Sequence, residues 1–271
     1  MNIAAINPDL DAIACSSAQE GVIVLDASAS IDETQQQVIR DGVLAYLSRL
    51  PGRNAKIAIV EYGITARIIM PYTEVTAASL ASTIAPALQN DYHDGSILGW
   101  TNWDAGLTTM NDLIDSVPGR PDYMVFITDG QPNHYIDENG TARGPFGNNA
   151  GENPGIAVRG AHPEASAFKE SGAHFYGFFI GDGGDTFETI RSVSSSTTDS
   201  LEFSPPVFNI NEADWTRAES FGDFIQKLIV FGDQVCRGTT GHLITGNVFE
   251  DVNGDSSRAD ELPIENARVM M

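Results

Sequence analysis

Short, almost continuously apolar segments recur along the chain, and most of them are rich in β-branched or aromatic residues. This pattern is typical of strands that are covered on both faces of a sheet. The segments that show it are Gly21–Leu25, Ala55–Val60, Ala66–Met70, Tyr123–Ile127, His174–Ile180 and Val207–Ile210. Only a few residues separate the second segment from the third, which predicts an antiparallel pair, because a parallel crossover needs a dozen or more residues.

Between these strands, apolar residues recur three and four positions apart, which is the spacing of an amphipathic helix. The first such stretch follows Ser30 and is expected to end at Pro51-Gly52. Thr76 predicts the N-cap of the next helix, and Gly172 is expected at the C′ position of a later one. The expected helices carry or span Ile39 to Leu50, Leu80 to Leu88, Leu107 to Ile114, Pro163 to Ser171, Thr186 to Val193 and Asp214 to Phe231.

Strands and helices alternate almost throughout, and this order specifies the fold class. We predict an α/β, Rossmann-like fold: a mostly parallel open sheet with one antiparallel edge strand and helices on both faces. Residues 131–155 are full of Gly, Asn and Pro and are expected to form a surface insertion loop. Loops of this length are usually functional or mobile.

Two of the expected strands end on an aspartate. Asp26 closes the first strand and begins the string Asp26-Ala-Ser28-Ala-Ser30, and Asp129 follows the strand Tyr123–Ile127. Ligands of such sheets bind at the carboxyl ends of the strands, so the two aspartates are expected in one site. Nucleophilic catalysis, phosphate binding, metal binding and a plain helix cap all suit a strand that ends in this way.

Two of these chemistries fit poorly. A serine hydrolase needs its serine at an elbow between glycines, together with a histidine base. Alanines flank these serines, and we interpret His134, His162 and His242 as surface residues. A phosphate-binding loop needs glycines and a lysine after the strand, and an aspartate there would repel phosphate.

Metal binding uses every residue of the string. Alternate residues of an extended segment point the same way, so Asp26, Ser28 and Ser30 can converge on one point. Their oxygens are hard ligands, suited to Mg²⁺, Mn²⁺ or Ca²⁺ rather than to zinc or copper. A cap on the following helix by Ser28 or Ser30 explains the string alone equally well.

Three segments taken together resemble the von Willebrand factor type A (VWA) domain. They are Asp26-x-Ser28-x-Ser30, Thr101-Asn-Trp-Asp-Ala-Gly-Leu107 and Val125-Phe-Ile-Thr-Asp129-Gly, in this order and each at an expected strand end or loop. In that family the matching segments form the metal-ion-dependent adhesion site. The resemblance covers about residues 18–234 and implies a VWA domain over residues 18–236, preceded by an N-terminal extension, residues 1–17.

The resemblance implies five metal positions, which are Asp26, Ser28, Ser30, Thr101 and Asp129. The two serines bind the cation directly, whereas Thr101 and the two carboxylates bind it directly or through water. One coordination position accepts a carboxylate from a partner protein, and Mg²⁺ is the expected ion, with Mn²⁺ or Ca²⁺ as alternatives. Trp100, Trp103 and the loop 131–155 are candidates for the rim of the site, although core packing and a solvated loop explain them at least as well.

The amino-acid composition excludes some classes of binding partner. The 271 residues include 37 acidic and 15 basic side chains, for a net charge of −22. Such a surface would repel nucleic acid and anionic membranes. No apolar run reaches the roughly 18 residues that a membrane helix needs. The N-terminus lacks a basic region, so we expect a secretion signal to be removed or not used.

The two cysteines, Cys15 and Cys236, flank the predicted domain. We interpret them as a disulfide between the ends of the domain, which would remove about 4–5 kcal/mol of unfolded-state entropy in the simple chain model. A disulfide implies an oxidising compartment. Two unrelated buried thiols are the alternative interpretation.

The C-terminal residues 237–271 break the alternation of strands and helices. Acidic or amide residues at alternate positions of a loop resemble calcium-binding loops. The segment is also similar to the start of the calcium-binding B-type repeat of bacterial surface adhesins, although Ser256 replaces the turn glycine. The candidate calcium ligands are Asp251, Asn253, Asp255, Asp260 and Glu261. A solvated acidic linker is the alternative, and because the repeat stops short at Met271 we expect a fragment of a longer protein or a truncated gene.

The function expected from these observations is that of a non-enzymatic adhesion module of bacterial type, extracellular or at the cell surface. It would act as a monomeric domain of a larger chain and bind, through a divalent cation, a protein ligand that presents an acidic side chain. The alternative is an intracellular VWA adaptor for an ATPase during complex assembly or metal insertion. The cysteine pair and the repeat-like tail favour the adhesion module.

Overall fold

The computed structural model describes residues 19–97, 99–117, 121–145, 155–181, 193, 201–202 and 213–234. The chain divides into two units, Met1–Thr239 and Thr240–Met271, and the second lies wholly outside the described residues. Cys15, Cys236 and the candidate calcium residues of the tail also lie outside them. The disulfide, the calcium loop and the domain boundaries therefore stay predictions.

A seven-stranded sheet forms the centre of the first unit, in the order β3-β2-β1-β4-β7-β9-β8. Strands β2 and β3 are antiparallel, and the other neighbours in this sheet are parallel. The strands are β1 (Gln19–Asp26), β2 (Ala55–Tyr62), β3 (Ala66–Glu74), β4 (Tyr123–Thr128), β7 (His174–Ile180), β8 (Leu201–Glu202) and β9 (Ala213–Ala218). The predicted α/β, Rossmann-like fold with one antiparallel edge strand is confirmed.

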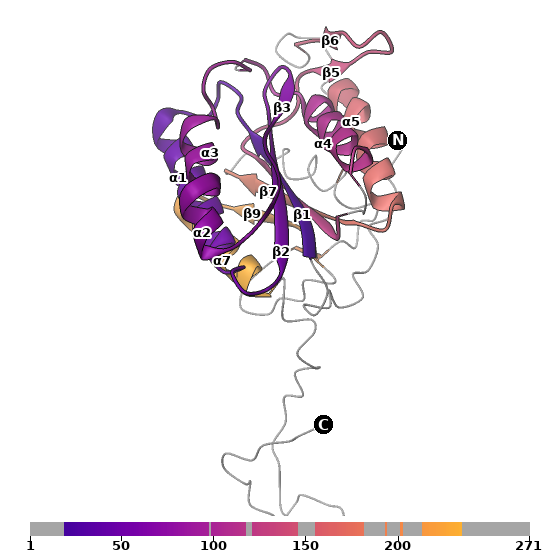
Figure 1. Cartoon of the computed structure of the whole chain (residues 1–271). Helices are drawn as coiled ribbons and strands as arrows, with labels where there is room; N and C mark the ends of the chain where they lie inside the picture. The colour runs from indigo at the N-terminus through magenta and orange to yellow at the C-terminus, as the bar shows by residue number, and fades with distance from the viewer. Residues whose placement is uncertain are drawn as a thin grey trace, which may run out of the picture. The chain divides into compact units, whose positions relative to one another are not determined.

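Helices cover both faces of this sheet (Figure 1). One face carries α1, α2, α3 and α7, and the other carries α4 and α5. The helices are α1 (Glu33–Leu47), α2 (Ala77–Ser79), the π-helical segment η1 (Leu80–Ile84), α3 (Ala85–Asn90), α4 (Trp103–Asp115), α5 (Gly155–Glu170) and α7 (Phe221–Gln234). Within the described part of the chain, no helix has the length and apolar character needed to cross a membrane.

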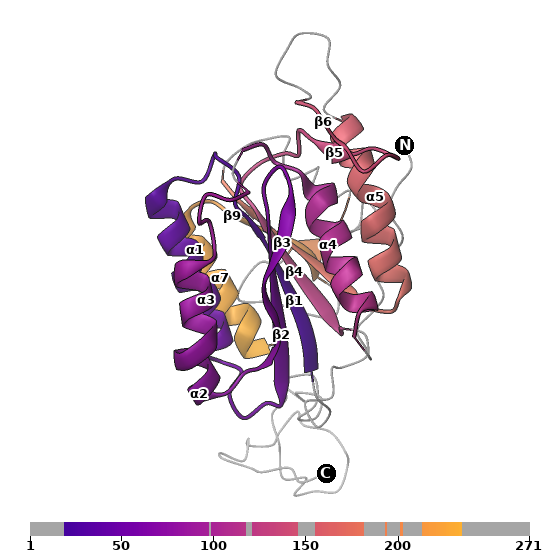
Figure 2. The same cartoon turned by 45° about the horizontal axis from the view of Figure 1, so that its top comes forward.

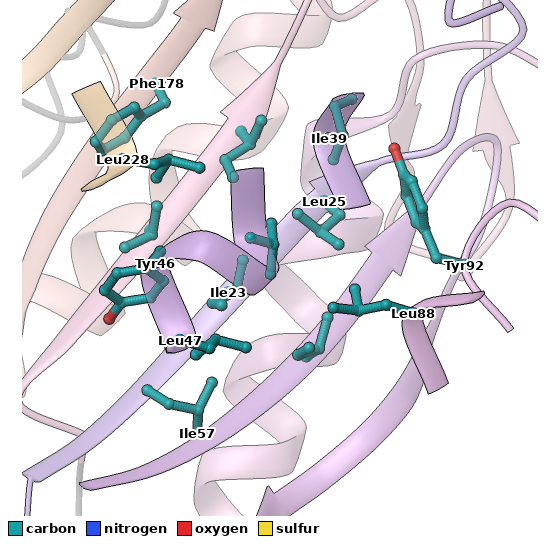
Figure 3. Packing of buried hydrophobic residues seen from close by; sticks show 14 of the residues in the cluster. Ile23, Leu25, Ile39, Tyr46, Leu47, Ile57, Leu88, Tyr92, Phe178 and Leu228 are labelled. Atoms are coloured by element: carbon teal, nitrogen blue, oxygen red, sulfur yellow. The ribbon is translucent and has the colours of Figure 1, made fainter. Parts of the chain in front are cut away.

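The continuous apolar runs in the strands follow from this two-sided cover. Successive side chains of a strand point to opposite faces, so β1 sends Ile23 and Leu25 into one core and Val22 and Val24 into the other. Figure 3 shows Ile23 and Leu25 packing among the side chains of α1. Because apolar side chains fill both cores, the polar residues that could bind a ligand lie at the ends of the strands.

Two predicted elements were wrong in their bounds. Helix α5 begins at Gly155 and contains Pro163, because buried Ala157, Ala161 and Phe168 pack this stretch against the sheet as a helix. Ala213–Ala218 is strand β9, paired with β7, and the final helix begins only at Phe221. Packing of the helix in the first case and pairing of the strand in the second outweighed the local pattern. The strand expected at 207–210 and the helix expected at 186–193 lie, except for residue 193, outside the described residues.

The segment after β4 is only partly a loop. Residues 135–136 and 142–143 pair as a small antiparallel hairpin of β5 (Tyr135–Ile136) and β6 (Ala142–Arg143). Both Figure 1 and Figure 2 place this hairpin beyond the same end of the sheet at which α4 begins. The hairpin therefore lies at the edge where the two aspartates were expected.

A candidate metal site at the carboxyl edge of the sheet

The candidate site lies where the strand order reverses. The chain adds β2 on one side of β1 and later adds β4 on the other, so the loops that leave β1 and β4 part in opposite directions. Such switch points form the ligand-binding crevices of open α/β sheets. Asp26 is the last residue of β1, and Asp129 directly follows β4. Figure 2 turns this edge of the sheet forward.

A chain of hydrogen bonds joins the two aspartates. The Ser28 backbone N–H donates to Asp26 Oδ1 at 2.8 Å. The Ser28 and Ser30 hydroxyl oxygens lie 2.9 Å apart, and the Ser30 hydroxyl donates to Asp129 Oδ1 at 2.9 Å. Side chains at alternate positions after β1 therefore converge, as predicted, and Asp129 meets them from the neighbouring strand.

The two carboxylates differ in exposure, because Asp129 is only half-buried. Asp26 is fully buried, and its Oδ2 accepts hydrogen bonds from the Thr128 hydroxyl at 2.8 Å and the Tyr62 hydroxyl at 3.2 Å. Burial raises the pKa of Asp26. Burial, and then the negative charge of Asp26, raise the pKa of Asp129 to about 7. Two acids held close together in this way favour a cation between them.

The donor set fits a hard divalent cation. Within the described ranges, no Lys, Arg or His side chain forms an ion pair with Asp26 or Asp129. Carboxylate and hydroxyl oxygens are ligands that Mg²⁺ and Ca²⁺ accept. The described residues contain no group of three His, Cys, Asp or Glu side chains that could hold a metal. A site in this part of the chain would therefore rely on hydroxyls as well as acids.

The helix-cap alternative for the two serines does not hold. The N-cap of α1 is Asp32, whose side chain accepts from the Gln35 N–H, while the Gln35 side chain accepts from the Asp32 N–H. This reciprocal capping box satisfies the start of the helix without Ser28 or Ser30. The two serines therefore lie in the loop before the cap and point into the group around Asp129.

Thr101 lies on a neighbouring loop. The Ala29 N–H donates to Gly99 O at 2.9 Å, which ties this loop to the serine loop. Among the described residues, Thr101 makes no hydrogen bond to the other four predicted ligands. The structure thus brings four of the five together through hydrogen bonds and places the fifth on the loop that Gly99 ties to the serine loop. Their role as metal ligands stays a prediction.

Sequence reasoning missed the residue that fixes Thr101. Asn133 Oδ1 accepts from the Thr101 N–H at 3.0 Å, and Thr101 O accepts from the N–H groups of Asn133 and His134 at 2.9 and 3.1 Å. The insertion therefore clamps the Thr101 backbone from the side of β4. No sequence motif marks Asn133, because it lies in a loop 32 residues away from its partner.

A second group of missed residues braces the site from behind. The Tyr92 hydroxyl donates to Asp26 O at 2.6 Å, and His93 Nε2 lies 3.3 Å from Ser28 O. The His93 N–H donates to Glu61 Oε2 at 2.8 Å. The turn-rich loop before Thr101 thus holds the backbone that carries the site.

The candidate rim residues separate into two kinds. Trp103 is fully buried and its indole N–H donates to Thr128 Oγ1 at 3.3 Å, so it packs in the core. Trp100 is 43% exposed. His134 was expected at the surface, but it is only 4% exposed. Trp100 stacks on its ring, and burial lowers the pKa of His134. His162 is also buried, within α5.

Gly63 is expected to be a sensitive position for the site. A Cβ there would lie 2.0 Å from Ile97 O, in the loop that carries Thr101. Gly63→Ala is therefore expected to displace this loop, lower the free energy of unfolding by about 1–3 kcal/mol, and weaken cation binding. Urea denaturation and a Mg²⁺ titration measure the two effects.

Gly130→Ala is the matched control, because a Cβ at Gly130 meets nothing within 4 Å. Equal stability and equal cation affinity of the Gly63→Ala and Gly130→Ala variants would contradict the role of the close contact at Ile97.

The family model of the von Willebrand factor type A domain matches residues 22–131, which include all five predicted metal positions. No curated protein matches the chain in sequence. Three solved structures illustrate the similarity in fold. The pilus adhesin SpaC from Lactobacillus rhamnosus GG has a TM-score of 0.59 and 16% identity, and the match covers 82% of this chain and 31% of SpaC.

A von Willebrand factor type A protein from Catenulispora acidiphila has a TM-score of 0.51 and 13% identity, over 87% of this chain and 51% of its own. Proximal thread matrix protein 1 from the mussel byssus, solved with a zinc-occupied MIDAS motif, has a TM-score of 0.54 and 17% identity, over 83% of this chain and 47% of its own. This chain thus spans about a third to a half of the length of these three proteins.

Proposed function

We propose that this chain is a VWA-type adhesion module that binds a protein ligand through a divalent cation. The proposed ligands of the cation are Asp26, Ser28, Ser30, Thr101 and Asp129. The observation that carries the proposal is the continuous set of hydrogen bonds from Asp26 through the two serines to Asp129. This set brings two acids with no basic partner in the described residues to the switch point of the sheet.

Each part of the site has a separate task in this proposal. Asp26 is held by Thr128 and Tyr62, so it supplies negative charge from a fixed position. Ser28 and Ser30 supply neutral oxygens, and the bound cation supplies an electron-poor position for a carboxylate of the partner. A cation here also offsets the repulsion between an acidic ligand and a chain of net charge −22.

The neighbours in fold support the choice of adhesion over catalysis. SpaC is named as a pilus adhesin, and the mussel protein as a thread matrix protein whose MIDAS motif holds zinc. The hydroxyls of Ser28 and Ser30 contact each other and Asp129, whereas a serine nucleophile needs a histidine base. We therefore place the module outside the cell or at its surface, as part of a longer protein, with no enzymatic role.

A binding experiment with and without chelator tests the proposal. The immobilised chain is expected to retain proteins from cell-surface or extracellular-matrix extracts in Mg²⁺ and to release them in EDTA. The Asp129→Ala variant is expected to lose most of this retention, because it removes one of the two acids of the site. Quantitative mass spectrometry of the eluates measures the difference.

The control is Asp112→Ala, which removes an exposed acid on α4 at the same cost in charge. The proposal would be wrong if retention were equal in Mg²⁺ and EDTA, or equal for the chains with and without Asp129.

A further inference from the structure

Trp100 presents a large aromatic surface beside the proposed cation site. It directly precedes Thr101, and 43% of it is exposed. In the described residues, only Ile68 is a comparably exposed large hydrophobic residue, at 42%. Single exposed hydrophobic residues are common, so exposure alone does not indicate a binding role.

The way in which Trp100 is held does indicate one. Its ring stacks on the buried ring of His134, with the ring centroids 5.6 Å apart and the planes 20° apart. His134 Nδ1 in turn lies 3.0 Å from Asn133 Oδ1, and the same oxygen accepts from the Thr101 N–H. The indole is therefore fixed on one face and at its base. A preorganised aromatic side chain loses little freedom when a ligand covers its other face.

The charge around this edge of the sheet determines which kind of ligand group would bind the exposed face of the indole. Asp32 and Glu33 are exposed where the serine loop enters α1, and Asp129 follows β4. Two arginines at this end of the fold are paired with carboxylates. Arg67 contacts Glu61 at 2.5 Å and Asp94 at 2.9 Å.

The second of these basic residues, Arg143 on the hairpin of the insertion, contacts Asp137 at 2.6 Å. This end of the fold thus carries exposed acids and two arginines that carboxylates neutralise, on a chain of net charge −22. A cation can bind an aromatic face through the ring quadrupole, most strongly for tryptophan, and surrounding acids strengthen that attraction.

We propose that Trp100 binds an arginine or lysine side chain of the protein ligand, next to the carboxylate that completes the cation shell. This inference rests on the proposed function and adds the chemistry of the partner: an acidic residue accompanied by a basic one. The acidic residue binds at the metal, and the basic residue covers the indole. The pair also lets an acidic module recognise an acidic side chain without net repulsion.

Three blocked peptides test the inference. Each contains one glutamate in a glycine–serine background, and arginine, leucine or serine stands two residues away. Their affinities for the whole chain in Mg²⁺ are measured by isothermal titration calorimetry, which applies equally to variants that lack the indole. We expect the arginine peptide to bind about threefold to tenfold more tightly than the serine peptide.

Substitutions at Trp100 test whether its indole causes the arginine preference. Trp100→Ala is expected to remove the arginine preference, and Trp100→Phe to keep part of it. Ile68→Ala, which truncates the other exposed hydrophobic residue, is expected to leave it unchanged. The thermal response of each variant to Mg²⁺ checks that the cation site persists. If Trp100→Ala loses the thermal response to Mg²⁺, the test relies instead on whether Trp100→Phe shows a weaker arginine preference than the unchanged chain.

The outcomes separate this inference from the proposed function. Equal affinities of the arginine and serine peptides, tightest binding of the leucine peptide, or a preference that survives Trp100→Ala would overturn the basic-residue site. Mg²⁺-dependent binding of all three peptides without preference would leave the proposed function standing. If none of the peptides bound in a Mg²⁺-dependent way, both would be overturned.

Discussion

Mg²⁺ or Mn²⁺ is expected to raise the free energy of unfolding of this chain by about 2.7 kcal/mol when the free cation is at one hundred times its Kd. The gain arises because the cation binds the folded chain, in which Asp26, Ser28, Ser30 and Asp129 converge, and has no such site in the unfolded chain. Asp26→Ala is expected to remove most of this gain. Thermal unfolding with a range of cation concentrations measures it.

The comparison is made within each variant, with and without cation. Asp26→Ala also leaves the Thr128 and Tyr62 hydroxyls without their carboxylate partner, so its absolute stability changes for a second reason. Asp112→Ala, which removes an exposed acid on α4, should keep the full gain. A melting temperature that cation leaves unchanged in all proteins would contradict the site. A gain that survives Asp26→Ala would indicate binding elsewhere, for example at Asp251 to Glu261.

Arg67→Ala is expected to lower the free energy of unfolding at pH 7 by about 3 kcal/mol. The Glu61 side chain is fully buried, and it accepts from Arg67 Nε at 2.5 Å and from the His93 N–H at 2.8 Å. Removing the guanidinium leaves a buried carboxylate with only the backbone donor. The loss should exceed that of an ordinary surface ion pair, because Glu61 cannot turn to water.

This loss should depend on pH. Burial raises the pKa of Glu61. The hydrogen bonds from the His93 N–H and the Arg67 side chain, together with the positive charge of Arg67, lower that pKa. Without Arg67 the folded-state pKa rises further above the unfolded one, so the folded chain takes up a proton more readily as the pH falls. The deficit of the variant should therefore shrink from pH 7 towards pH 5.

Urea denaturation at the two pH values measures this deficit. The double variant Arg67→Ala and Glu61→Gln should recover part of the stability at pH 7, because its buried side chain carries no charge. A deficit below about 0.5 kcal/mol that is equal at both pH values would show that the pair behaves as a solvated surface ion pair.

Much of the fold follows from local patterns in the sequence. Strands β1, β2, β3, β4 and β7 were predicted from their apolar runs, which are typical of a sheet covered on both faces, whereas the short strands β5 and β6 were not. The antiparallel edge pair followed from the short link after Val60. Where the pattern was weaker, pairing partners decided: Ala213–Ala218 became a strand because β7 offered it hydrogen bonds.

For the site, the sequence indicated which residues end their strands at the same edge, and their oxygen chemistry. It left a helix cap and a metal site equally possible for Ser28 and Ser30. Asp32 removed that ambiguity by capping α1 itself. The burial that raises the pKa of Asp26 and Asp129 was not predictable, because it depends on how the strand ends pack in the folded chain. Nor were the Thr128 and Tyr62 hydroxyls, whose hydrogen bonds lower the pKa of Asp26.

The sequence by itself thus determined the alternation of elements, the strand ends and the candidate ligands, because these depend on periodicity and on residue type at one place in the chain. Only the tertiary structure decided that Asn133 clamps Thr101, that His134 is buried under Trp100, and that Glu61 depends on Arg67. These contacts mostly join loops far apart in the chain. Their geometry is set by how strands and helices pack, and no local pattern records it.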